Sequence, residues 1–427
     1  CLKIMNISII GAGYVGLVTG ACFAKLGNDI IILDIDKEKL EKIKRGIPPI
    51  YEEGLDELLK NYRYRIEVTQ DYNYAIKESE ITFICVGTPS KEDGSIDLSY
   101  VKDAARSIGN ALRGKKEWHL VVVKSTVLPG TTTDIVLPIV EKFSGKKAGK
   151  DFGIAMNPEF LREGKAVKDF LEPDRIVIGC YDERSKEVLR ELYKDFDCPV
   201  LETSPSSAEM IKYASNAFLA TKISFINEIG NICKRLGIDT YEVADGMGLD
   251  KRIGRAFLDS GIGWGGSCFP KDTRALLRWV EEMGDDLKIV RSAVEVNEKQ
   301  PLKIIDLLKK YVKNLKGIKI GVLGLAFKPG TDDIRESRSI PVAKKLMEEG
   351  AEVLAYDPQA MDNFKRIFPN LRYCTSAEDV LSECEIILIL TNWDEFRNLN
   401  YSGKIVIDGR RLIEAKKTAK IYEGVCW

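Results

Sequence analysis

The chain has 427 residues, and its 64 lysines and arginines nearly balance its 65 aspartates and glutamates, for a formal net charge of −1. At roughly 150 residues per domain, this length predicts about three domains. The balanced charge lacks the basic excess that nucleic-acid binding needs, so we expect no nucleic-acid partner. No apolar run approaches the roughly 18–20 residues of a transmembrane helix, so we expect no membrane span.

The residue types also limit the chemistry. The single histidine, His119, excludes metal centres and catalytic relays that need several histidines. The ten cysteines show no C-x-x-C spacing and no disulfide framework, which indicates a reduced, cytoplasmic setting and no metal site. Strand-like sequence begins almost directly after Met5, which predicts no signal peptide and favours Met5 as the natural start.

The first chemical motif is a glycine fingerprint that follows a short buried strand. Residues 6–10 are typical of that strand, Gly11-Ala12-Gly13-Tyr14-Val15-Gly16 comes next, and helical sequence continues to Leu26. A second strand at 30–33 ends in Asp34. One unit thus contains a strand, the fingerprint, a helix, a second strand and a terminal acid. This order predicts a Rossmann-type site with a pyrophosphate at the helix N-terminus.

Each residue of the fingerprint has a physical role in this prediction. Gly11 permits the tight turn, Gly13 lets the backbone approach the pyrophosphate, and Gly16 allows close packing of helix on strand. Asp34 can accept hydrogen bonds from both ribose hydroxyls and would repel a 2′-phosphate, which favours NAD over NADP. The alternative is a glycine turn that binds no ligand.

Two further strands of the same alternation end in small polar residues. The strand at 81–86 runs into Gly87-Thr88-Pro89, and the strand at 120–124 runs into Ser125-Thr126. Ligands of such sheets bind beyond the carboxyl ends of the strands, so both ends are candidate cofactor contacts. His119 stands at the opposite, amino end of its strand, and we predict no catalytic role for it.

A strand at 154–156 leads into an acidic segment at 157–164. Glu159 and Glu163 are four residues apart, so on a helix they would share a face. Such a pair can form an acid/base couple or a solvated surface, and spacing does not decide between the two.

The middle of the chain predicts one long helix. Ser206 and Glu209 match a capping box, and apolar residues between 210 and 233 lie nearly all the way round, which predicts burial on most sides as a central spine between domains or subunits. Lys212 and Asn216 are four apart on it and face the same way. They are either a functional pair or a snorkelling lysine beside a structural amide.

Residues 261–272 form the most unusual stretch, because four glycines in six residues let the backbone close over a ligand. Pro270 suits the first turn of a following helix, which places Cys268 at a helix N-terminus beside Lys271. There the pKa of the thiol should fall toward that of a reactive thiolate, which favours a nucleophile over a core residue. Asp272 follows four residues later, within reach of the same site.

A second α/β unit follows, without a glycine fingerprint. Its predicted strands are 318–323, 353–356, 386–390 and 404–407. Lys328, Arg335 and Arg410 fall where strands end, which suggests a second anionic ligand. Ordinary surface charge is the alternative.

A reactive thiol together with an NAD site predicts an oxidation that passes through a covalent intermediate. Hydride transfer turns an alcohol into an aldehyde, a thiolate adds to it, the thiohemiacetal loses a second hydride, and water cleaves the thioester to an acid. Lys212 and Asn216 are suited to stabilising the oxyanions, and Asp272 or Glu159 could move protons through water.

At these residues the chain closely resembles the UDP-glucose/GDP-mannose dehydrogenase family over nearly its whole length. The motifs that carry the resemblance are G-A-G-Y-V-G-L (11–17), C-V-G-T-P-S (85–90), K-S-T-V-L-P-G-T (124–131), N-P-E-F-L-R-E-G (157–164), P-D-R-I-V-I-G (173–179), A-E-M-I-K-Y-A-S-N-A-F (208–218), G-G-S-C-F-P-K-D (265–272) and F-K-P-G-T-D-D-I-R-E-S (327–337).

The resemblance implies two Rossmann-like doubly wound parallel-sheet domains joined by a central all-helical dimerisation region. The implied domains are an NAD-binding domain at 1–204, a helical domain with the catalytic cysteine at 205–302, and a UDP-sugar-binding domain at 303–427. A homodimer or larger homo-oligomer is also implied, with Arg252 reaching across the dimer.

Roles follow from the resemblance position by position. The residues that look catalytic are Cys268, Lys212, Asn216, Asp272, Thr126 and Glu159. Those that match cofactor contacts are Gly11, Gly13, Tyr14, Val15, Gly16, Asp34, Lys39, Thr88, Thr126, Glu163, Lys271 and Arg335. Those that match the UDP-sugar site are Glu159, Phe160, Leu161, Lys212, Asn216, Arg252, Phe257, the 261–265 loop with Gly265, Lys328 and Arg410.

The resemblance also implies the reaction, a four-electron oxidation with two NAD per substrate. The segments 173–179 and 266–272 favour UDP-glucose, and Ser267 stands where relatives acting on UDP-N-acetylmannosamine tend to have histidine. GDP-mannose or another UDP-hexose is the alternative substrate. Rival classes are a single-step NAD alcohol dehydrogenase and a non-catalytic sugar-nucleotide/NAD sensor.

Overall fold

The computed structural model describes residues 4–427. The first three residues of the predicted 1–204 domain, which include Cys1, lie outside the described part. Contacts divide the chain into two compact units, Cys1–Ala214 and Ser215–Trp427. None of the helices in the described part combines the length and apolar content that a membrane span requires.

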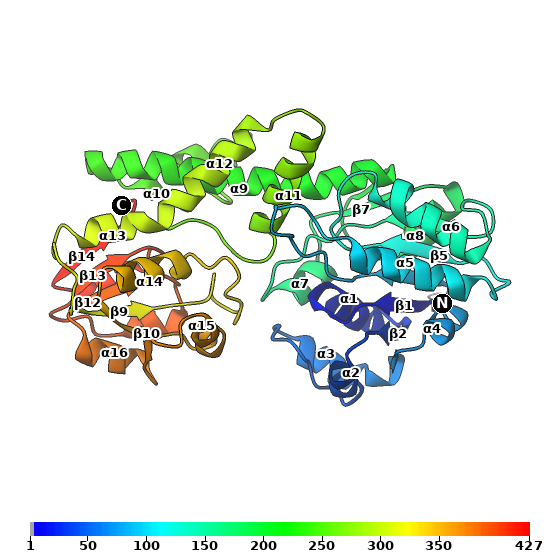
Figure 1. Cartoon of the computed structure of the whole chain (residues 1–427), viewed down its shortest axis with the longest axis horizontal. Helices are drawn as coiled ribbons and strands as arrows, with labels where there is room; N and C mark the ends of the chain where they lie inside the picture. Colours follow the sequence, from blue (N-terminus) through cyan, green and yellow to red (C-terminus); the bar gives the residue numbers. More distant parts are fainter. Residues whose placement is uncertain (1–3) are drawn as a thin grey trace. The chain divides into compact units, whose positions relative to one another are not determined.

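The first unit is built on one eight-stranded sheet, in the order β3-β2-β1-β4-β5-β6-β7-β8 (Figure 1). Its strands are β1 (Asn6–Ile10), β2 (Asp29–Leu33), β3 (Ile66–Thr69), β4 (Ile81–Ile84), β5 (Leu120–Val123), β6 (Gly153–Met156), β7 (Ile176–Cys180) and β8 (Val200–Thr203). All neighbours pair in parallel except β6 and β7. The first six strands have the order of a dinucleotide-binding fold.

Helices cover both faces of this sheet. They are α1 (Tyr14–Lys25), α2 (Lys37–Lys44), α3 (Leu55–Asn61), η1 (Arg63–Arg65), α4 (Tyr72–Glu78), α5 (Ser99–Leu112), η2 (Thr131–Val136), α6 (Leu137–Ser144), α7 (Ala166–Leu171) and α8 (Glu183–Leu192). Along β2, Ile30 and Ile32 join one buried cluster, whereas Ile31 and Leu33 join another. Successive side chains of a strand point to opposite faces, so both faces are buried and the sheet is doubly wound.

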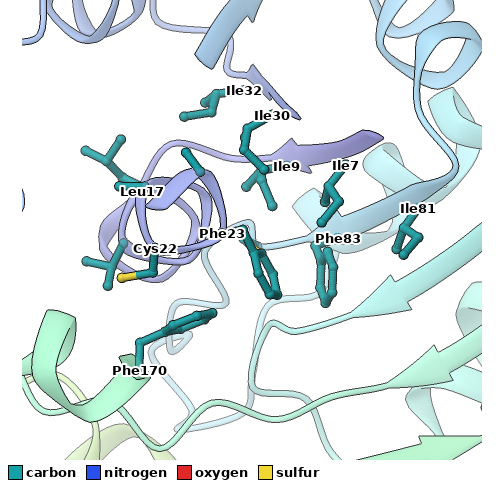
Figure 2. Packing of buried hydrophobic residues seen from close by; sticks show 14 of the residues in the cluster. Ile7, Ile9, Leu17, Cys22, Phe23, Ile30, Ile32, Ile81, Phe83 and Phe170 are labelled. Carbon is teal, nitrogen blue, oxygen red and sulfur yellow. The ribbon is translucent and has the colours of Figure 1, made fainter. Parts of the chain in front are cut away.

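Aromatic side chains form the centre of the cluster beneath α1. Figure 2 shows Phe23 from α1 pointing between Phe83 of β4 and Phe170 of α7. The ring centroids of Phe23 and Phe83 are 5.6 Å apart, and those of Phe23 and Phe170 are 5.1 Å apart. This packing fixes α1, and with it the fingerprint turn at its N-terminus, against the sheet.

Helix α9 (Pro205–Leu236) starts in the first unit and continues into the second. The predicted capping box is wrong: Ser204 caps the helix by accepting from the Ser207 N–H at 3.2 Å. Glu209 instead accepts from the backbone N–H groups of Gly130 and Thr132, at 2.7 and 2.8 Å. A carboxylate suits that place because the helix starting at Thr131 has unsatisfied N–H groups at its N-terminus.

Within the single chain, α9 keeps one apolar face open. Phe218 is 65% exposed, Phe225 46% and Ile232 44%, at intervals of seven residues that place them on one face. The opposite faces are buried, as predicted. The predicted place of α9 as a spine between domains or subunits stays a prediction.

The second unit contains the helices that follow in the chain and a six-stranded sheet. Its helices are α10 (Thr240–Gly248), α11 (Phe269–Glu282), α12 (Lys288–Lys299), η3 (Gln300–Leu302), α13 (Lys303–Leu308), α14 (Ser339–Glu348), α15 (Met361–Ile367), α16 (Ala377–Glu383), η4 (Asp394–Asn398) and η5 (Ile413–Lys417). Its strands are β9 (Lys319–Leu323), β10 (Glu352–Tyr356), β11 (Arg372–Tyr373), β12 (Ile386–Ile389), β13 (Ile405–Asp408) and β14 (Ile421–Gly424). They pair in parallel throughout, in the order β11-β10-β9-β12-β13-β14.

The two sheets repeat the same turn after their first strand. Gly11 has φ +99° and Gly324 has φ +97°, a region open to glycine. Each sheet also has an aspartate after its second strand. Asp357 is fully buried and already accepts from the Leu325 N–H and the Trp393 indole, at 2.7 and 2.9 Å. Two Rossmann-like sheets with helices between them in the chain confirm the predicted fold class.

Candidate active site

The three fingerprint glycines differ in what surrounds them. A Cβ on Gly16 would lie 1.9 Å from the Gly11 carbonyl oxygen, and a Cβ on Gly11 would lie 2.9 Å from that of Cys85. A Cβ on Gly13 would meet no atom within 4 Å. Gly11 and Gly16 are therefore needed for packing, whereas Gly13 leaves an open space at the N-terminus of α1. Tyr14 and Val15 begin that helix.

Asp34 lies at the end of β2, 9% exposed, and is fixed beside this turn. Its Oδ2 accepts from the Ala12 N–H at 2.6 Å, and Lys39 Nζ lies 3.6 Å from the same oxygen. The predicted contacts Thr88 and Thr126 also meet, because the Thr88 hydroxyl donates to the Thr126 carbonyl at 3.0 Å. An open glycine, a helix N-terminus and a strand-end acid fit NAD.

A buried acid that the sequence analysis missed joins this turn to a later loop. Glu52 is 6% exposed and accepts from the Tyr14 hydroxyl at 2.6 Å. It also accepts from the backbone N–H groups of Gly164 and Ala166, both at 2.7 Å. The loop that carries Glu163 is therefore tied to the start of α1. Glu52 stands in irregular sequence between two helices, so no periodicity pointed to it.

Glu159 and Glu163 are not on a helix, so the condition for a shared face is not met. The segment after β6 is a loop in which the Leu161 N–H donates back to Glu159 Oε2 at 2.6 Å. The Glu159 carboxylate is buried against the Lys212 ammonium, 2.8 Å away. The snorkelling alternative for Lys212 therefore fails, since its side chain is 4% exposed. Burial raises the pKa of Glu159, but Lys212 and the Leu161 N–H outweigh burial and hold this pKa below its usual range.

A second buried lysine, Lys124, lies near this pair. It donates to Asn157 Oδ1 at 2.9 Å, and burial lowers its pKa to about 8. Phe160 lies between cations, with Arg175 3.8 Å and Lys212 5.6 Å from its ring centroid. The sequence analysis had assigned no role to Lys124 or Arg175, although both lie in motifs that carry the family resemblance, at 124–131 and 173–179.

In the second unit, Cys268 is the N-cap residue of α11, with Pro270 in the first turn, as predicted. Its Sγ lies 3.6 Å from the Ser267 hydroxyl. One turn further, Asp272 is 1% exposed and accepts from the Asn216 amide at 2.6 Å. Lys271 Nζ pairs with the other Asp272 oxygen, also at 2.6 Å.

Lys212 and Asn216 are thus both engaged with carboxylates. They stand four residues apart on α9, and each holds a buried acid within its own unit, Glu159 for Lys212 and Asp272 for Asn216. Buried carboxylates are stabilised only by such partners. This arrangement supplies ammonium, amide and carboxylate groups suited to oxyanion stabilisation and proton transfer.

A cavity of about 380 Å³ opens in the second unit beside the glycine loop. It is lined by Ile223, Phe257, Asp259, Gly261, Gly263, Trp264, Gly265, Phe269, Phe327 and Arg410. Arg410 donates to the Gly263 carbonyl at 2.9 Å, and burial lowers its pKa to about 10. The surface-charge alternative therefore fails for Arg410, which offers a cation to an anionic ligand.

The other predicted basic contacts are more exposed. Lys328 Nζ lies 5.4 Å from the centroid of the Phe327 ring at the cavity. Arg335 is 65% exposed and pairs with Asp333, and Arg252 is 89% exposed and pairs with Asp250. Within residues 4–427, no group of three or more histidine, cysteine, aspartate or glutamate side chains is arranged to hold a metal ion.

Comparison with known proteins decides the family. Residues 5–197 match the description "UDP-glucose/GDP-mannose dehydrogenase family, NAD binding domain", residues 206–299 its central domain, and residues 321–415 its UDP binding domain. The chain belongs to the UDP-glucose/GDP-mannose dehydrogenase family. The segment that contains Gly13 and Asp34 is accordingly the NAD binding domain of this family.

Individual relatives of this family cover almost the whole chain. UDP-glucose 6-dehydrogenase AglM of Haloferax volcanii is 48% identical over 97% of this chain and 98% of its own. GDP-mannose 6-dehydrogenase of Pseudomonas aeruginosa is 39% identical over 99% of this chain and 100% of its own. The solved UDP-glucose dehydrogenase of Pyrobaculum islandicum is 46% identical, covers 100% of this chain and 98% of its own, and superposes with a TM-score of 0.96.

Proposed function

We propose that this protein oxidises UDP-glucose to UDP-glucuronate by two successive two-electron steps on one substrate. The carrying observation is Cys268 at the N-terminus of α11, followed one turn later by the buried Asp272 that Asn216 holds. NAD, when bound, accepts one hydride in each step. The substrate assignment follows the more similar relatives, which are named for UDP-glucose.

In this proposal the Cys268 thiolate adds to the aldehyde carbon of the first product. The thiohemiacetal that forms on sulfur then loses a hydride and a proton to become a thioester, and water releases the acid and restores the thiol. The positive end of α11 favours the thiolate. Lys212 and Asn216 stabilise the oxyanions, and Asp272, with Glu159 and Thr126, orients water and takes its proton.

The binding residues are assigned within the same proposal. Gly13, Tyr14, Val15 and Asp34 would hold the cofactor, together with Gly11, Gly16, Lys39, Thr88, Thr126, Glu163, Lys271 and Arg335. The cavity in the second unit would take the sugar nucleotide, with Arg410 and Lys328 facing its phosphates and Phe257 and Gly265 in its wall. Glu159, Phe160, Leu161 and Arg252 are assigned to the sugar nucleotide from the family resemblance. The three matched segments support domains at 1–204, 205–302 and 303–427.

We also propose a homodimer, or a larger homo-oligomer, that uses α9. The supporting observation is the exposed apolar face made by Phe218, Phe225, Ile232 and Leu236, since large exposed apolar patches mark interaction sites. The eight described cysteines other than Cys268 form no disulfide bond, which supports a reducing, cytoplasmic compartment.

The deciding experiment measures NADH formed per sugar nucleotide, with UDP-glucose and GDP-mannose supplied in turn. We expect two NADH per UDP-glucose and slower turnover of GDP-mannose. GDP-mannose is the alternative substrate because the 39% identical relative is named for it. Cys268→Ser should block acid formation. One NADH per sugar would instead indicate a simple alcohol dehydrogenase, and binding without turnover would indicate a sensor.

A further inference from the structure

The glycine loop at 261–266 has no regular secondary structure, so its backbone polar groups need partners from elsewhere. The Gly261 N–H donates to Asn227 Oδ1 of α9 at 2.7 Å. The carbonyl of the same glycine accepts from Gln300 Nε2 at 2.8 Å. Two side-chain amides from different elements therefore fix the start of the loop.

A third amide fixes its middle. Asn297 of α12 accepts from the Trp264 N–H at 2.7 Å and donates to the Trp264 carbonyl at 2.9 Å. One side chain thus satisfies both backbone groups of one residue, as a neighbouring strand would. The Trp264 indole is fixed as well, because it donates to the Ser224 hydroxyl at 2.9 Å.

These amides are deeply buried, and a fourth amide orients one of them. Asn227 and Asn297 are fully buried and Gln300 is 1% exposed. Asn231 donates to Gln300 Oε1 at 2.9 Å, which orients the Gln300 amide toward Gly261. A buried amide left without its partner costs about 1–3 kcal/mol, so the loop and the amides stabilise a single arrangement.

We propose that Asn227, Asn297 and Gln300, the amide clamp, are positioning residues that pre-organise the glycine loop as a wall of the sugar-nucleotide cavity. Gly261, Gly263 and Trp264 line that cavity. Four glycines in a short loop would otherwise lose much conformational entropy when a ligand binds, and the clamp removes that cost beforehand. The identity of the ligand rests on the proposed function, whereas the clamp itself rests on contacts within the second unit.

Gly263 shows how closely the clamp approaches the loop. It has φ +100°, and a Cβ there would lie 2.5 Å from Asn297 Oδ1. Gly263→Ala would therefore place a methyl group against the Asn297 side chain. Asn297→Asp would instead remove the donor to the Trp264 carbonyl and bury a charge. The two variants disturb one contact from opposite sides.

The test compares Asn297→Asp and Gly263→Ala with the matched control Asn314→Asp at an exposed position. Hydrogen–deuterium exchange of a peptide covering 260–268 reports loop order, and calorimetry with UDP and with NAD reports the two affinities. We expect loop exchange to accelerate about tenfold or more and the Kd of UDP to rise about 10- to 100-fold in both variants. The Kd of NAD should stay within about twofold, and the control should match the wild type.

Unchanged loop exchange in both variants would overturn the proposal, as would an equal loss of UDP and NAD affinity, which indicates general loss of structure. If Asn297→Asp does not fold, Gly263→Ala tests the same contact. A wild-type protein that binds no sugar nucleotide would contradict the proposed function, while the exchange measurement, which needs no ligand, would still decide whether the clamp orders the loop.

Discussion

Lys212 Nζ of α9 lies 2.8 Å from Glu159 Oε1 in the loop after β6, and the two side chains are 4% and 7% exposed. The residues are 53 positions apart in the sequence. A buried charge is tolerated only with a close partner, so each residue keeps the other ionised. An ammonium held this way is ready to stabilise a developing oxyanion without moving.

Removing either member of this pair should be strongly destabilising, and removing the second as well should add little. We expect Lys212→Ala or Glu159→Gln alone to lower the free energy of unfolding by about 3–5 kcal/mol, because the remaining group is left uncompensated. The double variant should lose clearly less than the sum of the two. Urea denaturation of the four proteins forms a double-mutant cycle, and strictly additive losses would show that the two groups do not interact.

The same pair predicts an acid dependence. The pKa of Glu159 is lower in the folded than in the unfolded protein, so the stability it contributes is present above about pH 4.3 and is lost as the pH falls through the folded-state pKa. Unfolding free energies measured below pH 5 should fall less steeply for Glu159→Gln than for the wild type. Parallel curves would argue against an ionised Glu159.

The Asn216–Asp272 hydrogen bond predicts a change in the pH–rate profile. Asn216→Asp would place a second carboxylate about where the amide now donates to Asp272, and like charges raise one of the two pKa values. We expect turnover to fall and to gain an ionisation nearer neutral pH. Asp272→Asn should reduce kcat about 10²- to 10⁴-fold, as expected for a lost general base. Asp306→Asn, at a 70% exposed side chain, is the control.

Gly13 and Gly16 should respond differently to the same substitution. Gly13→Ala meets no protein atom within 4 Å, so its Tm should stay near that of the wild type while NAD affinity drops. Gly16→Ala would bring a Cβ to 1.9 Å from the Gly11 carbonyl oxygen and should destabilise the first unit itself. Thermal unfolding and NAD titration separate the two outcomes, and a Gly13→Ala protein with normal NAD affinity would refute the assigned role.

His119 predicts a second pH effect on stability, far from the catalytic groups. It is fully buried between Thr82 and the Ser79 carbonyl, and burial lowers its pKa to about 3. Because an unfolded histidine titrates near pH 6.5, stability is complete above that pH and is lost as the pH falls toward the folded-state pKa. Between pH 6.5 and 4.5 this amounts to about 2 kcal/mol.

Chemical denaturation across that range checks the histidine prediction. His119→Gln should flatten the dependence, and the comparison is clean because the chain has only one histidine. NADH production at pH 7 should remain close to that of the wild type, since a buried neutral imidazole contributes no charge there. An equally steep curve for His119→Gln would assign the acid sensitivity to carboxylates.

Local patterns predicted most of the fold because regular elements depend on short-range periodicity. The strands at 6–10, 30–33, 318–323 and 386–390 appear within one residue of their predicted bounds. The predicted capping box at Ser206 failed for a long-range reason, because Glu209 is engaged by Gly130 and Thr132. The spacing of Glu159 and Glu163 left their roles open for a similar reason, since Glu159 turns inward to a lysine far along the chain.

The sequence by itself determined the family and the glycine fingerprint, and it singled out the proposed nucleophile, because these depend on residue types at short fixed spacings. A chain with one histidine had to rely on thiol, ammonium and carboxylate groups, and Cys268 stood out among its cysteines by its glycine-rich setting. Tertiary structure decided which groups are paired: Lys212 with Glu159, Asn216 with Asp272, and Asn297 with Trp264. Such pairings depend on contacts between distant segments, and burial then makes each one energetically obligatory.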